Sequence, residues 1–232
     1  MGFIYFLIFS VVLFLLSLVS YEKFRSTTLY ALAIGGAVNA NFFHAGNYPI
    51  VCFGISFGID SIIYSLFAFC VILMYLKENK REAYILSFSS VIAIMFSACM
   101  QLVSNLLTVG SSVAVWKEFS NFAVSTIATV ITIFIMLETI NKLKQKNINQ
   151  FVLLIIGMLI VSVVNSSIYY TAVTLINRVP ENIWNLMLGS LIGKFIALLC
   201  SLGVLYLSTK IDAIILRKKQ KNVIDSTDNN LD

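Results

Sequence analysis

The sequence contains few charged residues, and this scarcity decides the broad class of the protein. Asp, Glu, Lys and Arg make up 12% of the 232 residues, about half of what is usual in soluble domains, whereas apolar residues make up 59%. A soluble domain of this length needs a polar surface that this composition cannot supply. The composition therefore excludes a soluble globular enzyme and a disordered or fibrous chain, and it predicts an integral membrane protein.

Residues that carry catalysis or bind metals are also scarce. The chain has one histidine, His44, and its four cysteines lie singly in apolar stretches without a Cys-x-x-Cys pair, so we interpret them as small buried hydrophobic residues. The sequence contains no phosphate-binding loop, no His-Glu-x-x-His motif and no nucleophile elbow. It therefore predicts no enzyme, no metal or cofactor site, and no ATP hydrolysis by this chain itself.

Long apolar stretches predict an all-α, polytopic bundle of about seven transmembrane helices. A helix needs roughly 20 apolar residues to cross a bilayer core of about 30 Å. Seven stretches come close to this length, and the second is the shortest and most polar. They cover residues 2–20, 28–43, 50–76, 83–108, 119–141, 150–177 and 184–209. Residues 1–214 are expected to form one membrane domain, followed by a basic, polar cytoplasmic tail over residues 215–232.

The net charge of +5 reflects the positions of the basic residues rather than affinity for nucleic acid, since no basic face with interleaved aromatic residues is present. Thirteen of the sixteen Lys and Arg residues lie in the tail and in the first, third and fifth loops between the predicted helices. Only Lys117 and Arg178 lie in the second, fourth and sixth loops. Because basic loops stay in the cytoplasm, the N-terminus is expected outside and the C-terminus inside. The expected location is the cell membrane, which in bacteria is the inner membrane.

Two opposite charges lie deep inside predicted helices. Asp60 and Lys194 each lie about ten residues from the predicted outer end of their helix, which places both roughly 15 Å deep at 1.5 Å per residue. Ionisable groups in membrane helices usually face a cavity or each other, so these two residues are predicted to pair. The pair could lock two helices together, or it could act as a gate or as a counter-charge for a substrate. A Gly-x-x-x-Gly pattern, typical of close helix packing, precedes each charge at residues 54–58 and 189–193.

Uncharged polar residues repeat on the faces of other predicted helices. Gln101 and Asn105 lie one turn apart, and Asn165 and Tyr169 repeat this spacing later in the chain. Because an amide in hydrocarbon needs a hydrogen-bonding partner, these residues predict either a polar pocket for a small planar ligand or a network that only holds helices together. The predicted substrate-binding residues are Asn41, Asp60, Tyr64, Gln101, Asn105, Asn165, Tyr169, Ser190 and Lys194. Glu138 is interpreted separately, as a surface pair with Lys142.

Five short segments follow the pattern of a known family. They are Tyr21–Ala31, Asn39–Asn41, Pro49–Ile50, Phe57–Asp60 and the late Gly189–Ser190. Together they resemble the vitamin-uptake-like (VUT) family, which is associated with transport of queuosine precursors. The resemblance implies an importer of a small heterocyclic metabolite, with Asp60, Asn41 and Ser190 at positions that match the family's motifs. The chain departs from the family at Tyr64, where an acidic residue is typical, and it lacks the following Tyr-Gly-Lys stretch and the Arg-Asn pair ahead of the Gly-Ser.

The leading hypothesis is a carrier that imports a small polar or heterocyclic compound while Asp60 and Lys194 separate or re-pair. One alternative is the substrate-binding S-component of an energy-coupling-factor importer, which would dock its partner subunits on the small-residue face of residues 33–37. Another is a membrane sensor or assembly module whose polar network is structural. The expected partners are a small-molecule substrate and the lipid bilayer, and both a homodimer and energy-coupling subunits stay open.

Overall fold

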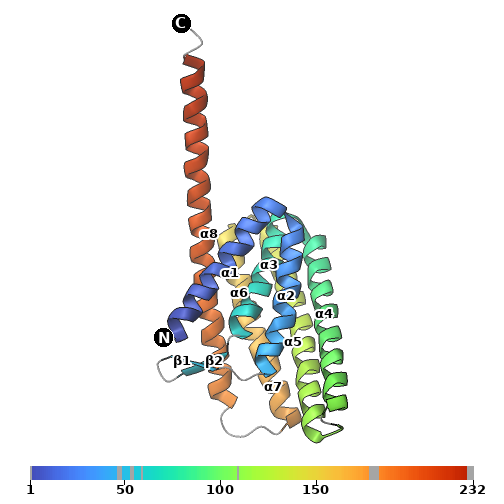
Figure 1. Cartoon of the computed structure of the whole chain (residues 1–232). Coiled ribbons are helices and arrows are strands. Elements are labelled where there is room, and N and C mark those ends of the chain that lie inside the picture. Colours follow the sequence, from blue (N-terminus) through green and yellow to red (C-terminus); the bar gives the residue numbers. More distant parts are fainter. Residues whose placement is uncertain are drawn as a thin grey trace.

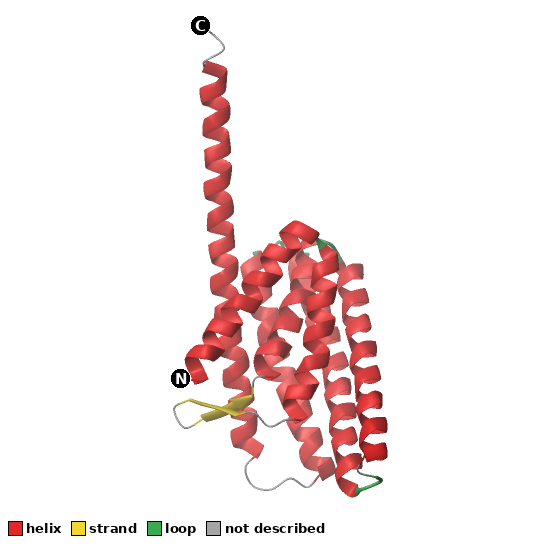
Figure 2. Cartoon of the chain, in the orientation of Figure 1, coloured by secondary structure: helices red, strands yellow, loops and turns green. Residues whose placement is uncertain are grey.

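The protein is a polytopic helical bundle with one short β-hairpin, as the computed structural model shows for residues 2–45, 49–52, 55–58, 60–108, 110–177 and 183–228 (Figures 1 and 2). Counting the contiguous segments α6, η1 and α7 as one, the described chain makes seven helical passes, which confirms the predicted fold class. The elements are α1 (Gly2–Phe24), α2 (Ser26–Ala45), β1 (Pro49–Cys52), β2 (Ile55–Gly58), α3 (Asp60–Lys77), α4 (Lys80–Thr108), α5 (Val113–Lys144), α6 (Gln150–Ile160), the π-helical turn η1 (Val161–Asn165), α7 (Ser166–Asn177) and α8 (Ile183–Asp228).

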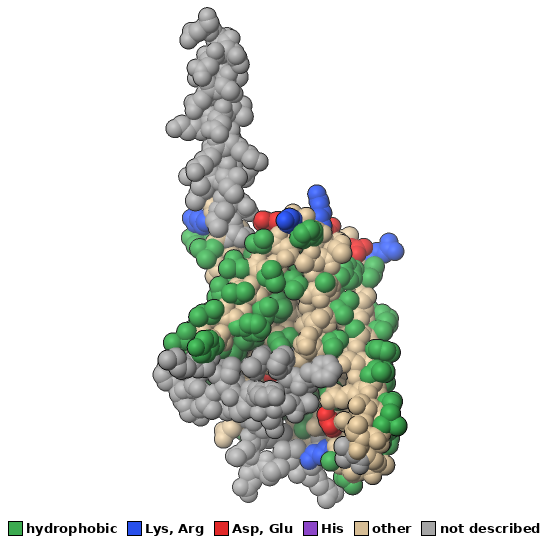
Figure 3. Space-filling model, in the orientation of Figure 1, with side chains coloured by type: hydrophobic (Ala, Val, Ile, Leu, Met, Phe, Trp, Pro, Cys, Tyr) green, Lys and Arg blue, Asp and Glu red, His purple; other side chains and the backbone are tan. Residues whose placement is uncertain are grey.

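Among the described residues, six helical segments are long and apolar enough to cross a membrane. They are Phe3–Phe24, Asp60–Lys77, Lys80–Thr108, Val113–Lys144, Gln150–Ile176 and Met187–Leu207. The outer sides of α1 and α4 are covered with apolar side chains, and charged side chains gather mostly toward the ends of the bundle (Figure 3). Helix α2 is not among the six, and its side chains are described only from Ser26 to Asn39.

Helix α3 is the central helix of the bundle. Every side chain from Ser61 to Tyr75 is buried except that of Tyr64, which is partly buried. A helix that is hydrophobic on all sides is expected to be buried, and α3 accordingly contacts α1, α2, α4, α6 and α8 (Figure 1). The residues that α3 presents to its neighbours therefore lie in the interior of the bundle.

Helix α2 packs closely on α3 through small residues. Ala33 and Ala37 are buried, and a Cβ atom at Gly36 would lie 3.6 Å from Ile63 of α3. Small residues let two helix backbones approach closely. The small-residue face on which the S-component alternative would dock partner subunits is therefore covered by the chain's own α3.

The prediction of a single helix over residues 50–76 is wrong in its first part. Strands β1 and β2 pair antiparallel, with Pro49 opposite Gly58, and α3 begins only at Asp60. A short apolar run rich in β-branched residues cannot be assigned to a strand or a helix by periodicity alone, and Pro49 suits the first residue of a strand. Asp60 therefore begins a helix instead of lying ten residues inside one. Gly58 belongs to a strand instead of a helical Gly-x-x-x-Gly contact, and Gly54 lies outside the described residues.

The connections rich in Lys and Arg lie at one end of the bundle, because successive passes run in opposite directions (Figure 1). Tyrosine hydroxyls link the passes there: Tyr30 donates to Glu82 at 3.1 Å and Tyr84 donates to Glu138 at 2.7 Å. The ion pair that the structure shows for Glu138 is with Lys80 of α4 at 2.8 Å, rather than the predicted pair with Lys142. Helix α8 continues to Asp228, across the predicted boundary at residue 215.

Candidate functional site

Lys194 lies in the interior of the bundle, eleven residues after the start of α8, and only 5% of it is exposed. Its Nζ atom donates to Ser166 Oγ at 2.8 Å and to Asn165 Oδ1 at 3.2 Å. The same atom lies 5.1 Å from the centroid of the Tyr64 ring, a distance at which an ammonium is attracted to the face of the ring. These contacts compensate for the loss of water around a buried charge.

Asn165 and Ser166 reach Lys194 at the point where the sixth pass changes its helical geometry. Helix α6 ends at Ile160, a π-helical turn follows from Val161 to Asn165, and α7 begins at Ser166. Such turns are rare and occur frequently at functional sites. The sequence predicted one regular helix over residues 150–177, and no residue pattern there signals the π-helical turn.

A chain of hydrogen bonds leads from Lys194 through four passes. Asn165 Nδ2 donates to the Tyr64 hydroxyl at 2.9 Å, and this hydroxyl donates to Thr129 Oγ1 at 3.2 Å. The Thr129 hydroxyl donates in turn to the Ser125 carbonyl oxygen at 2.8 Å. This series of hydrogen bonds therefore connects α8, η1, α3 and α5. In each bond, the group nearer to the ammonium is the donor.

Asp60 lies at the N-terminus of α3, close enough to Lys194, Tyr169 and Tyr170 to act on them electrostatically. A helix N-terminus carries a partial positive charge that stabilises a carboxylate. The Asp60 Oδ1 atom occupies the space that a Cβ atom at Gly58 would need. A side chain at position 58 would therefore push the Asp60 carboxylate out of this position. We refer to Asp60, Tyr64, Asn165, Ser166 and Lys194 as the Lys194 group.

Gln101 and Asn105 belong to a separate polar cluster. Gln101 Nε2 donates to Glu118 Oε1 at 3.1 Å, and Asn105 Nδ2 donates to Glu118 Oε2 at 3.2 Å. On α5, Glu118 precedes Thr129 by eleven residues, or roughly 16 Å along the helix axis. The structure therefore brings both amides together with Glu118 instead of with the polar side chains that contact Lys194. Glu118 was not among the predicted site residues, because the predicted helix began at residue 119 and Glu118 was therefore assigned to the loop before it.

The remaining predicted site residues lie on α7 and α8 or outside the described side chains. Ser190 is buried, and its Oγ atom lies 3.4 Å from Ser166 Oγ, one turn from Lys194. Tyr169 is also buried, and its ring centroid lies 5.1 Å from that of Tyr170. The side chain of Asn41 lies outside the described residues, so its predicted role stays a prediction.

A cavity of about 260 Å³ lies between α7 and α8. Tyr170 forms one of its walls and lies near Ser190, whose Oγ atom is 3.4 Å from that of Ser166 in the Lys194 group. The volume lies just below the range of about 300–1,000 Å³ that is typical of small-molecule sites. The residues lining the cavity are Tyr170, Thr171, Thr174, Leu175, Trp184 and Met187.

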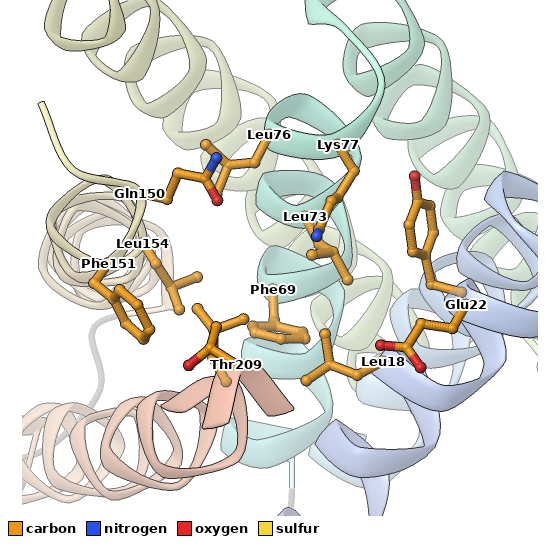
Figure 4. Close-up of a pocket in the computed structure, with 12 residues that line it drawn as sticks. Leu18, Glu22, Phe69, Leu73, Leu76, Lys77, Gln150, Phe151, Leu154 and Thr209 are labelled. Atoms are coloured by element: carbon orange, nitrogen blue, oxygen red, sulfur yellow. The ribbon is translucent and has the colours of Figure 1, made fainter. Parts of the chain in front are cut away.

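A smaller cavity of about 90 Å³ lies at the basic end of the bundle (Figure 4). Phe69, Leu73 and Leu154 form its apolar floor, and Glu22 and Lys77 lie at its edge. This volume is well below that of typical ligand sites. The cavity beside Tyr170 is therefore the stronger candidate for a substrate site.

No family model, curated protein or solved structure matches this chain. The functional argument therefore depends on the geometry of the Lys194 group and of the cavity beside it.

Proposed function

We propose that this protein is a membrane carrier for a small polar or heterocyclic metabolite, and that its substrate binds at the Lys194 group. The observation that carries the proposal is a buried ammonium held by two side chains of another pass at a π-helical turn, on the two helical passes whose outer residues line a cavity. Ionisable residues inside membrane helices are costly to place and generally mark a substrate or ion pathway.

The proposed mechanism is an exchange of partners around Lys194. A ligand in the cavity would meet Tyr170 first and then Ser190, which lies beside Ser166. A carbonyl or anionic oxygen of the ligand would replace Ser166 or Asn165 as the acceptor for the ammonium. Because those residues lie at the π-helical turn, the exchange would shift this pass relative to α8 and so open or close a path.

The walls of the cavity favour a planar ligand. Tyr170 and Trp184 offer aromatic surfaces, and Thr171 and Thr174 contribute hydroxyl groups. Aromatic side chains stack on flat rings, while a few polar groups fix their orientation. The resemblance to the VUT family makes a queuosine precursor base the first candidate, followed by other vitamin-like heterocycles.

The proposal is tested by uptake in a strain that lacks its own transporters for these compounds. Asp60→Asn and Lys194→Met are each expected to reduce uptake at least tenfold at equal amounts of protein in the membrane. Lys142→Met is the matched control, because Lys142 is exposed on α5. Wild-type uptake rates in both Asp60→Asn and Lys194→Met would exclude the proposed exchange, and a wild type that takes up none of the candidates would count against a carrier.

One observation favours a purely structural role for the same residues. The hydrogen bonds from Lys194 to the Ser125 carbonyl join four passes, as a network that only holds helices together would do. The two functions differ in their response to substrate. A carrier is expected to be protected against thermal unfolding by a queuosine precursor or another transported compound, with the protection lost in Lys194→Met, whereas a structural network would show no protection in either protein.

A further inference from the structure

Glu118 is held by two neutral carboxamides from the neighbouring helix. Gln101 and Asn105 lie one turn apart on α4, and each donates to a different oxygen of the Glu118 carboxylate, at 3.1 Å and 3.2 Å. All three side chains are partly buried, between the last part of α4 and the first part of α5. The cluster therefore combines one negative charge with two amides whose oxygen atoms are not used in these bonds.

The two amides can change from donors to ligands without any movement of the backbone. A half-turn about the terminal torsion of a carboxamide exchanges its nitrogen and oxygen atoms, and that torsion is soft. After this rotation, Gln101, Asn105 and Glu118 would all direct oxygen atoms into the same space. Carboxylate and carbonyl oxygens are the ligands that hard cations prefer.

The observed spacing suits a bound cation. The rotation would put each amide oxygen where the amide nitrogen now lies, 3.1–3.2 Å from a carboxylate oxygen. Two oxygens at that separation, each about 2.4 Å from an ion, subtend about 80° at the ion, which is close to the right angle of octahedral coordination. Each amide therefore lies at a distance from its carboxylate oxygen that an ion between them could also span.

The charge of the cluster favours a monovalent ion. Calcium sites usually combine several carboxylates, whereas this cluster contributes one. Asn105 lies in the last turn of α4, where free carbonyl groups add a partial negative charge that attracts cations. We propose that Gln101, Asn105 and Glu118 form a Na⁺ site at the junction of α4 and α5.

The same helix connects this Na⁺ site with the Lys194 group. Helix α5 carries both Glu118 and Thr129, and Thr129 accepts the hydrogen bond of Tyr64. An ion that ties Glu118 to α4 would fix the position of α5 and therefore that of Thr129. This consequence, coupling of Na⁺ to transport, depends on the proposed carrier function, whereas Na⁺ binding itself does not.

The test uses the purified full chain in lipid nanodiscs, with Na⁺ exchanged for choline at constant ionic strength. Binding of ²²Na⁺ is expected to reach one ion per chain, and the temperature of unfolding is expected to rise with Na⁺ but not with choline. Glu118→Gln is expected to weaken Na⁺ binding at least tenfold. Glu82→Gln is the matched control, because Glu82 accepts from Tyr30 at the opposite end of the bundle and should leave Na⁺ binding unchanged.

Two results would overturn the Na⁺ site: equal effects of Na⁺ and choline on the wild type, or unchanged Na⁺ binding in Glu118→Gln. If Glu118→Gln does not fold, Gln101→Leu removes one ligand and keeps the charge, and it is expected to weaken binding several-fold. Unchanged binding in that variant would also contradict the site. If the protein binds Na⁺ but takes up none of the candidate metabolites, only the carrier function is contradicted. If it takes up a metabolite equally well in Na⁺ and in choline, and does not bind Na⁺, only the Na⁺ site is contradicted.

Discussion

Replacing Tyr64 by Phe tests whether the hydrogen-bond chain contributes to the stability of the bundle. The substitution removes one hydroxyl but keeps the ring that lies 5.1 Å from Lys194 Nζ. The lost hydroxyl accepts from Asn165 at 2.9 Å and donates to Thr129 at 3.2 Å. Two hydrogen bonds are therefore lost, and the Asn165 amide is left without that acceptor in the interior of the bundle.

The expected loss follows from these two bonds. Hydrogen bonds between membrane helices contribute about 0.6 kcal/mol on average and up to about 1.7 kcal/mol each. A buried donor left unsatisfied costs about 1–3 kcal/mol. Because the Thr129 hydroxyl still donates to the Ser125 carbonyl, the larger part of the loss falls on Asn165. We expect Tyr64→Phe to lower the free energy of unfolding by about 1.5–3 kcal/mol.

The assay is reversible unfolding of the purified protein in mixed micelles, with Tyr30→Phe as the matched control. Tyr30 makes one hydrogen bond to Glu82 near the end of the bundle, so its loss is expected to cost about 1 kcal/mol or less. Tyr64→Leu removes the aromatic ring as well, and it should cost more than Tyr64→Phe because the contact with the ammonium is also lost. A loss in Tyr64→Phe no larger than that in Tyr30→Phe would refute the inferred contribution of the chain.

Two glycine substitutions test the packing around the site and around α3. Gly58→Ala is expected to reduce uptake, but less than Asp60→Asn does, because the new methyl group would displace the end of the Asp60 side chain without removing its charge; near-wild-type uptake would contradict the role of Gly58. Gly157→Ala is expected to destabilise the bundle, since the added Cβ would lie 2.7 Å from Ile72 Cδ1 and 2.8 Å from Ile140 Cδ1, and overpacking of this kind costs about 1–3 kcal/mol.

Gly203→Ala provides the control for Gly157→Ala. Gly203 is exposed on α8, and a Cβ atom there would have no neighbour within 4 Å. Alanine has a higher helix propensity than glycine by up to about 1 kcal/mol, so this variant should be as stable as the wild type or more stable. Unfolding measurements that rank Gly157→Ala equal to Gly203→Ala would contradict the close contact of α6 with α3 and α5.

The helical passes could be predicted from the sequence because crossing a membrane depends on summed hydropathy over a local segment. The predicted span 83–108 corresponds to Lys80–Thr108, and the span 150–177 corresponds to Gln150–Asn177. Asp60 and Lys194 could be selected by the same local rule, since a charge inside an apolar segment stands out in the sequence. None of these predictions required knowledge of which passes lie side by side.

Local apolar content could not predict the backbone geometry within a pass. The strands of residues 49–52 and 55–58 and the π-helical turn at 161–165 lie in stretches as apolar as the helices around them. The π-helical turn lies where Asn165 and Ser166 contact Lys194, which is 29 and 28 residues away along the chain. A pattern of side chains along one segment carries no information about such partners.

By itself, the sequence determined that this is a membrane protein of helical passes with two isolated charges in its apolar stretches, because hydropathy and charge are properties of each segment alone. Only the tertiary structure decided which polar groups meet. It placed Gln101 and Asn105 on Glu118 and connected Lys194 to Tyr64 through Asn165. Hydrogen-bond partners are chosen by distance in space, and helix packing sets that distance.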